Sequence, residues 1–176
     1  MYSLIFLLAM AAVVIGIQFA MRFWRMRRLT HWFKRGTEAF AAERFEEALP
    51  AFRKCVGIAP EWLHTRTLLA MCLAQTGEQQ AALKEITLVE QLQPRHGETW
   101  ALISLFYAMV MPDKQEHLLQ ALQTLYELEP QVAAKLIHKP QFQRFDTEPF
   151  QELFRRIKEW EAQHDKETPD GSGQPE

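Results

Sequence analysis

The stretch from Trp32 to Pro60 reads WFKRGTEAFAAERFEEALPAFRKCVGIAP, and its pattern returns 34 residues later in RTLLAMCLAQTGEQQAALKEITLVEQLQP, residues 66–94. A third copy starts at Trp100 and runs two residues late in its second half. The positions that recur are, in the first copy, Trp32, Gly36, Ala48, Phe52 and Pro60; in the second, Arg66, Ala70, Ala82, Ile86 and Pro94; and in the third, Trp100, Ser104, Tyr107, Leu118, Leu122 and Pro130. Such self-similarity at a fixed period is typical of stacked repeats.

These residues resemble the tetratricopeptide repeat (TPR) pattern, W-x2-L-G-x2-Y, then A-x3-F, then P. The resemblance implies that each copy folds as two antiparallel helices and that the copies stack side by side in an α-solenoid. We therefore expect three helix pairs, at 29–62, 63–96 and 97–130.

The spacing has a physical basis in how closely two helices approach each other. Small residues are expected where the paired backbones come nearest, Gly36 against Ala48 and Ala70 against Ala82, because a larger side chain would push the axes beyond the usual ~8–10 Å. Proline then ends the second helix of each pair, since it has no backbone N–H and disfavours helical geometry just before it. The three stops are Pro60, Pro94 and Pro130.

Residues 131–164 follow a different pattern, which predicts C-terminal capping helices. Thr147-Glu148-Pro149 is a helix-start signal. Apolar residues then recur at spacings of three and four, and they are Phe150, Leu153, Phe154, Ile157 and Trp160. A helix with one polar face suits the end of a solenoid. Residues 165–176 lack an apolar anchor, which predicts a disordered tail.

The first 28 residues favour a transmembrane anchor with a basic collar. No charge occurs from Leu4 to Met21, and about 20 apolar residues span a bilayer as a helix. A cleaved signal peptide is the alternative, but its basic start is missing here, because the first charge is Arg22. The predicted fold class is therefore all-α: a transmembrane helix, then a TPR-type α-solenoid of three helix pairs with C-terminal capping helices.

The charges around that segment predict its orientation. Arginines that flank a span stay on the cytoplasmic side, so we expect a single-pass protein of the bacterial inner membrane with its N-terminus outside and its repeats in the cytoplasm. Contact with the membrane surface is expected from Arg22, Arg25, Arg27 and Arg28. Small residues every fourth position allow close packing between spans, which favours a membrane complex or a homo-oligomer. These residues are Ala12, Gly16 and Ala20.

The net charge of −2 conceals an asymmetry. All six Lys and Arg that precede Gly36 lie between Arg22 and Arg35. From Gly36 onward there are 14 Lys and Arg against 22 Asp and Glu, which is −8 by subtraction. A nucleic-acid-binding domain would normally carry a basic patch on its folded part, so we expect no nucleic-acid partner.

The sequence offers no pattern typical of catalysis or metal binding. Cys55 and Cys72 are too few for a disulfide scaffold and form no CxxC pair, and the six histidines include no HExxH or His-x3-His pair. No Gly-rich phosphate loop or nucleophile elbow occurs. We therefore expect a non-enzyme with no cofactor and no metal.

The remaining candidate for a functional site is a surface that binds a protein partner. In the TPR family the first helix of each pair lines a concave groove that takes peptides or helices. The resemblance and the helical spacing together assign to this groove Phe33, Thr37, Phe40, Thr67, Met71, Gln75, Leu105 and Met109. This largely apolar set suits an amphipathic helix. We expect a membrane-anchored scaffold or adaptor that binds a protein partner at the cytoplasmic face. The alternatives are a groove filled by the chain's own helices, and a structural subunit of a stable membrane complex held by its span and convex surface.

Overall fold

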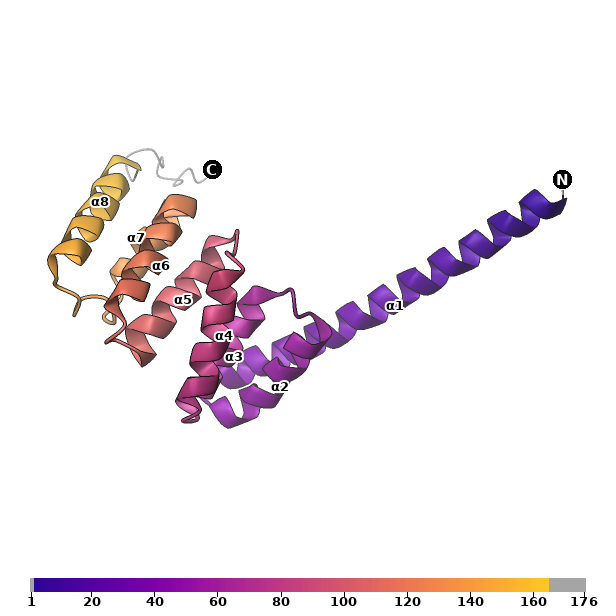
Figure 1. Ribbon diagram of the computed structural model, residues 1–176, viewed down its shortest axis with the longest axis horizontal. Helices are drawn as coiled ribbons and strands as arrows, with labels where there is room; N and C mark the ends of the chain where they lie inside the picture. Colours follow the sequence, from indigo (N-terminus) through magenta and orange to yellow (C-terminus); the bar gives the residue numbers. More distant parts are fainter. Residues whose placement is uncertain (1, 165–176) are drawn as a thin grey trace, which may run out of the picture.

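The structure, a computed structural model, describes residues 2–164, and for residues 2–9, 11 and 12 it describes the backbone alone. Within this range the chain forms eight helices and no strand, which confirms the all-α prediction (Figure 1). The helices are α1 (Tyr2–Ala41), α2 (Phe45–Ile58), α3 (Leu63–Gln75), α4 (Gln79–Gln91), α5 (Gly97–Val110), α6 (Gln115–Leu128), α7 (Pro130–Ile137) and α8 (Glu148–His164).

Neighbouring helices pair and then stack. The C-terminal half of α1 packs on α2, α3 on α4 and α5 on α6, while contacts of α3 with α2 and with α5 join one pair to the next. Helices α7 and α8 continue the row at the end opposite to α1 (Figure 1). This arrangement is a helical-repeat architecture, compatible with an α-solenoid.

The turns follow from residues that leave helical geometry. Glu43, between α1 and α2, has a φ of 57°, and Gly77, between α3 and α4, has a φ of +88°. Glycine adopts this left-handed region without steric penalty. Pro60 and Pro94 follow the second helices, whereas Pro130 is the first residue of α7, where proline's fixed φ fits the start of a helix.

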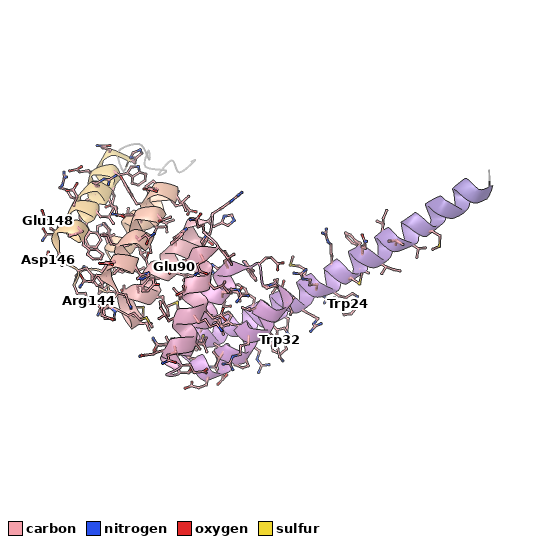
Figure 2. All side chains as sticks on the ribbon, in the orientation of Figure 1. Trp24, Trp32, Glu90, Arg144, Asp146 and Glu148 are labelled. Carbon is pink, nitrogen blue, oxygen red and sulfur yellow. The ribbon has the colours of Figure 1, made fainter. Side chains whose placement is uncertain are left out.

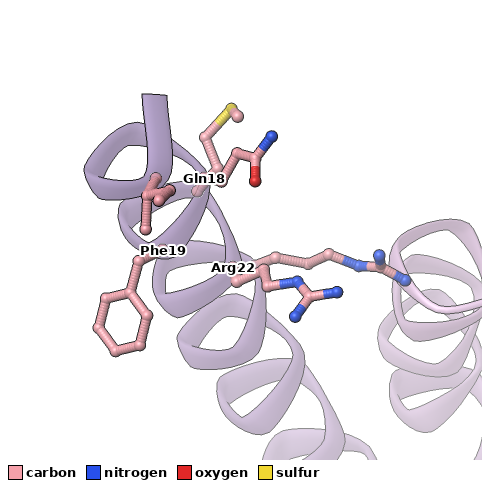
Figure 3. A pocket seen from close by; sticks show the side chains of 6 residues that line it. Gln18, Phe19 and Arg22 are labelled. Atoms are coloured by element: carbon pink, nitrogen blue, oxygen red, sulfur yellow. The ribbon is translucent and has the colours of Figure 1, made fainter. Parts of the chain in front are cut away.

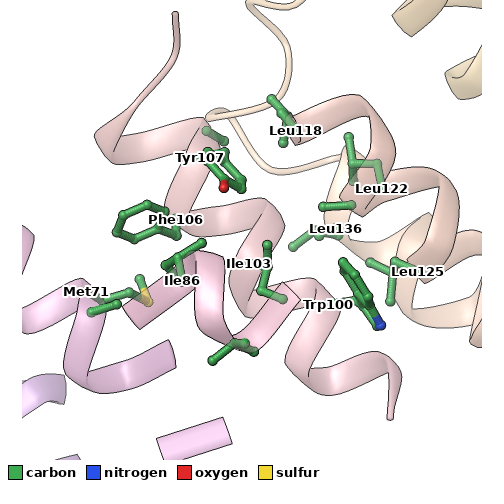
Figure 4. Packing of buried hydrophobic residues seen from close by; sticks show 14 of the residues in the cluster. Met71, Ile86, Trp100, Ile103, Phe106, Tyr107, Leu118, Leu122, Leu125 and Leu136 are labelled. Carbon is green, nitrogen blue, oxygen red and sulfur yellow. The ribbon is translucent and has the colours of Figure 1, made fainter. Parts of the chain in front are cut away.

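A main apolar cluster connects all three pairs with α7 and α8, and a smaller cluster of Leu29, Cys55 and Ala59 lies beside it. On α5, Trp100, Ile103 and Tyr107 are buried and face the leucines of α6 (Figure 4). Phe106 extends the same core towards the preceding pair (Figure 4). Burial of each large apolar side chain contributes about 1.5–3 kcal/mol of transfer free energy. The core therefore depends on contacts between pairs as well as within them.

Helices α1 and α2 meet closely at Gly36. A Cβ atom at this position would lie 2.8 Å from Cε1 of Phe52, a side chain of α2 that is fully buried. The glycine thus makes room for a phenylalanine ring, and this ring is the nearest group to it. Ala48, which we expected opposite Gly36, is also fully buried.

Helix α1 continues without a break from Tyr2 to Ala41. Its N-terminal part, residues 2–24 and here named the projecting segment, extends away from the stacked pairs (Figure 1). Trp24 lies on this segment, and Trp32 lies where α1 reaches α2 (Figure 2). The large apolar side chains that the segment exposes are Met10, Val13, Val14, Ile15, Ile17, Phe19, Met21, Phe23 and Trp24.

The prediction of a transmembrane anchor in residues 1–28 is wrong. Among the residues that the structure describes, no helix combines the length and the apolar character needed to cross a membrane. The predicted single-pass localisation, with the N-terminus outside and the repeats in the cytoplasm, is contradicted by the same finding.

Of the arginines predicted to contact a membrane surface, Arg25 also makes contacts within the described part of the chain. Arg25 joins α1 to the end of α2 and to the turn before α3, because its Nε donates to Ile58 O at 2.9 Å and its Nη2 to Glu61 Oε1 at 2.6 Å. A Cβ at Gly16 would meet nothing within 4 Å. The remaining arginines Arg22, Arg27 and Arg28, and also Ala20, are exposed. The side chain of Ala12 and the predicted disordered tail, 165–176, lie outside the described residues.

Candidate functional site

The first helices of the pairs present only part of the predicted groove to solvent. Gln75 and Met109 are exposed, and Met109 is 45% exposed. Leu105 is half-buried. Thr67 and Met71 are buried, since α3 packs against α2, α4 and α5 at once. The open surface of the groove is therefore narrower than helical spacing alone suggests.

The predicted groove residues on α1 pack against aromatic neighbours. Phe40 contacts Phe45 and Phe52, with ring centroids 5.5 and 6.3 Å away. Thr37 turns its hydroxyl back to the helix and donates to Phe33 O at 3.0 Å. Both side chains remain half-buried. The chain's own residues therefore cover part of both side chains that were predicted to face a partner.

One predicted residue, Phe33, borders a cavity of about 500 Å³. Its wall comes from α1, from the turn and first residues of α3, and from the turn and first residues of α5. We name it the aromatic pocket. Its lining includes Phe33, Glu61, Trp62, His64, Arg95, His96 and Glu98. Three successive helix pairs thus contribute to one site.

Three rings form the apolar part of the aromatic pocket. The Phe33 and Trp62 rings lie 4.6 Å apart between centroids, and the His64 ring lies 6.2 Å from Phe33. Trp62 and His64 are stacked, with 22° between their planes. Trp62 is only half-buried. The rings therefore leave part of the Trp62 side chain accessible at the cavity.

Charged groups surround these rings. Burial lowers the pKa of His64, and the negative charge of Glu98 acts in the opposite direction. The carboxylate of Glu61 is held by Arg25 at 2.6 Å. Arg95 adds a positive charge to the lining. The pocket thus combines an apolar centre with a rim that carries both signs of charge.

The repeat spacing explains how these residues meet. Adding 34 to Glu61, Trp62 and His64 gives Arg95, His96 and Glu98. Stacking one helix pair on the next places equivalent positions side by side, so the turn before α3 lies beside the turn before α5. The residues that follow Pro60 and Pro94 therefore carry a sequence signal for this pocket, which lies outside the first-helix positions that the TPR resemblance assigns to a groove.

Another depression, on the projecting segment, has a different character (Figure 3). Its lining residues are Ile15, Gln18, Phe19, Met21, Arg22 and Arg25, and all of them belong to α1. Because all of these residues lie on one helix, a ligand in this depression would contact the protein on one side only. The aromatic pocket is the better candidate because separate elements converge on it.

Comparison with known proteins adds no assignment: no protein-family model matches the chain, and no curated protein matches it at a significant level.

Proposed function

We propose that this protein is a TPR-type scaffold or adaptor that binds a protein partner through the side lined by α1, α3 and α5, with the aromatic pocket as its anchor point. The 34-residue repeat and the paired helices support the TPR assignment. The observation that carries the function is the convergence of three helix pairs on Phe33, Trp62 and His64.

The chemistry of the aromatic pocket supports a partner segment with one apolar or aromatic anchor. A buried aromatic contact surrounded by a polar rim is the usual arrangement of an energetic centre in a protein interface. Trp62 provides the apolar surface. Glu98 and Arg95 on the rim provide polar contacts that select the residues beside the anchor.

The open part of the groove supports a continuation of the same partner. Gln75 and Met109 are exposed near the C-terminal ends of α3 and α5. The thioether of methionine adapts to varied apolar surfaces. An amphipathic helix or an extended peptide with its anchor in the aromatic pocket and its apolar face on Met109 uses both features.

Site-specific photocrosslinking in cells tests this function. A photoreactive residue is introduced at Gln75 or Met109, and matched controls carry it at the exposed positions Lys84 and Glu127 on second helices. We expect both groove positions, and neither control, to crosslink to the same protein. Equal crosslinking from all four positions, or no specific product from the groove, contradicts the proposal.

A structural subunit of a stable protein complex is the second candidate. The projecting segment supports it, because Val13, Ile17 and Phe19 are each more than half exposed. A helix that is apolar on most sides is normally buried, and large exposed apolar patches mark interaction sites. Gentle extraction and sizing of the full chain distinguish the two: a partner retained at fixed stoichiometry supports the subunit, and a free monomer supports the adaptor.

A further inference from the structure

A second cavity of about 650 Å³ lies across the α4–α5 linker from the aromatic pocket, and Pro94 and Arg95 border both. We name it the Glu90 pocket. Its wall comes from α4, the linker, α5 and α6. The residues that matter for its chemistry are Glu90, Pro94, Arg95, Trp100, His117 and Leu128.

The carboxylate of Glu90 is the centre of a hydrogen-bond network. Its Oε2 accepts a hydrogen bond from the Tyr107 hydroxyl at 3.0 Å and lies 3.8 Å from Nδ1 of His117. The His117 ring stacks on the Tyr107 ring, with centroids 5.2 Å apart and 27° between the planes. These contacts fix the position of Oε2 and leave the second oxygen, Oε1, without a hydrogen bond or ion pair among the described residues.

A carboxylate in this position lacks a full counter-charge. The Glu90 side chain is only 18% exposed, and a buried charge is stabilised only when it is paired. Burial raises the pKa of Glu90, although the Tyr107 and His117 contacts act in the opposite direction. Glu90 lies centrally in the stacked body (Figure 2). Arg95 lines the same cavity, but the described residues include no ion pair between it and Glu90.

The rest of the pocket suits an aliphatic stem. Trp100 is buried, its Nε1–H donates to Pro94 O at 2.8 Å, and Leu128 is 43% exposed. These groups give an apolar wall beside the carboxylate. We propose that the Glu90 pocket binds an arginine side chain from a partner protein, with the guanidinium on Glu90 and the stem against Trp100 and Leu128.

Arginine fits better than other cations for geometric reasons. A planar guanidinium donates to a carboxylate and stacks on an aromatic ring at the same time, and the His117 ring lines the cavity beside Glu90. The chain from Gly36 onward is also acidic, with 14 Lys and Arg against 22 Asp and Glu, which attracts basic segments. This site lies outside the aromatic pocket, and its occupation does not require the function proposed above.

Titration with short blocked peptides tests the proposal on the full chain. The probe is acetyl-Gly-Arg-Gly-amide, and the matched control replaces arginine by citrulline, which has the same shape and no charge. The readout is the NMR signal of the Trp100 indole N–H, assigned with a Trp100→Phe variant because the chain has 5 tryptophans. We expect a saturable shift with the arginine peptide only.

Variants assign the effect to Glu90. Glu90→Gln keeps an acceptor for the Tyr107 hydroxyl and removes the charge, so we expect binding about tenfold weaker. Glu116→Gln, an exposed control on α6, is expected to bind as the wild type does. Arg95→Ala removes a positive charge that repels the peptide's guanidinium, so this variant should bind the arginine peptide at least as tightly as the wild type does. Equal shifts with citrulline, no shift at millimolar peptide, unchanged binding in Glu90→Gln, or lost binding in Arg95→Ala would each overturn the proposal.

Discussion

Glu129, in the turn between α6 and α7, lies directly against Gly97, the first residue of α5, and its Oε1 accepts a hydrogen bond from the Gly97 N–H at 2.8 Å. The first N–H groups of a helix have no partner inside the helix, and His96 makes no side-chain cap here. A residue 32 positions away therefore caps α5. A Cβ at Gly97 would lie 2.6 Å from Cδ of Glu129.

This contact predicts that the two positions are coupled in stability. Glu129→Ala removes the cap and should lower the free energy of unfolding by about 1 kcal/mol. Gly97→Ala displaces the Glu129 side chain and should lower the free energy of unfolding by about 1–3 kcal/mol. Urea unfolding measures both values. Glu127→Ala, an exposed neighbour on α6, is the control, and equal stability of the Glu129 and Glu127 variants contradicts the capping role.

The repeat spacing predicted the paired helices because side chains one repeat apart, which is 34 residues or 36 in the second half of the third copy, occupy equivalent positions in the stack. Phe52, Ile86 and Leu122 are all fully buried. The cap on Gly97 could not be predicted in the same way, since it joins the start of α5 to the end of α6 within one pair, and the 34-residue spacing relates only positions in successive pairs. The burial of Met71 also depends on how far α5 lies over α3, which helical spacing does not determine.

The transmembrane prediction failed for a related reason. Apolar composition indicates that side chains avoid water, but it does not identify what covers them. Helix α1 is unbroken from Tyr2 to Ala41, but within residues 2–164 no helix is long and apolar enough to cross a membrane. The aromatic pocket was missed in part because Trp62 and His64 lie just before and at the start of α3, outside the positions that helical spacing assigns to a groove.

The contact of Gly36 with Phe52 gives a second prediction. Gly36→Ala forces the buried Phe52 ring to move, and we expect a loss of about 1–3 kcal/mol in the free energy of unfolding. Gly57→Ala is the matched control, because a Cβ there meets nothing within 4 Å. The free energy of unfolding of that variant should rise by about 0.5 kcal/mol, because alanine has the better helix propensity. An unchanged free energy of unfolding in Gly36→Ala would show that α1 and α2 do not approach as described.

The two cysteines give a third prediction. Burial raises the pKa of Cys55 from 9.0 to about 11 and that of Cys72 to about 12. At pH 8 the thiolate fraction of Cys55 should be about a hundredfold below its ordinary value, so a thiol reagent should react slowly until the chain unfolds. Between pH 9 and 11 the unfolded chain loses these protons first, and stability should therefore fall. Rapid reaction of both thiols in the native protein contradicts their burial.

The ionisation of His64 gives a fourth prediction. Burial lowers its pKa and Glu98 raises it, so Glu98→Gln should lower the pKa of His64 further. Glu61→Gln, in the same pocket, is the control and should leave the His64 titration unchanged. NMR titration of the imidazole measures both. As pH falls through the ordinary value of 6.5, the unfolded chain takes up this proton first, and stability should decrease. An unchanged titration in Glu98→Gln contradicts the described proximity.

The most direct measurement of the central claim is the yield of the Met109 crosslink in cells when the aromatic pocket is altered. Trp62→Ala removes the indole of the pocket, and Trp24→Ala removes an exposed indole on the projecting segment. Circular dichroism verifies that both variants fold. The account predicts that Trp62→Ala lowers the specific crosslink by about tenfold, the usual loss for an aromatic anchor, and that Trp24→Ala leaves it unchanged. An undiminished crosslink in a folded Trp62→Ala protein would contradict the aromatic pocket as the anchor of the partner.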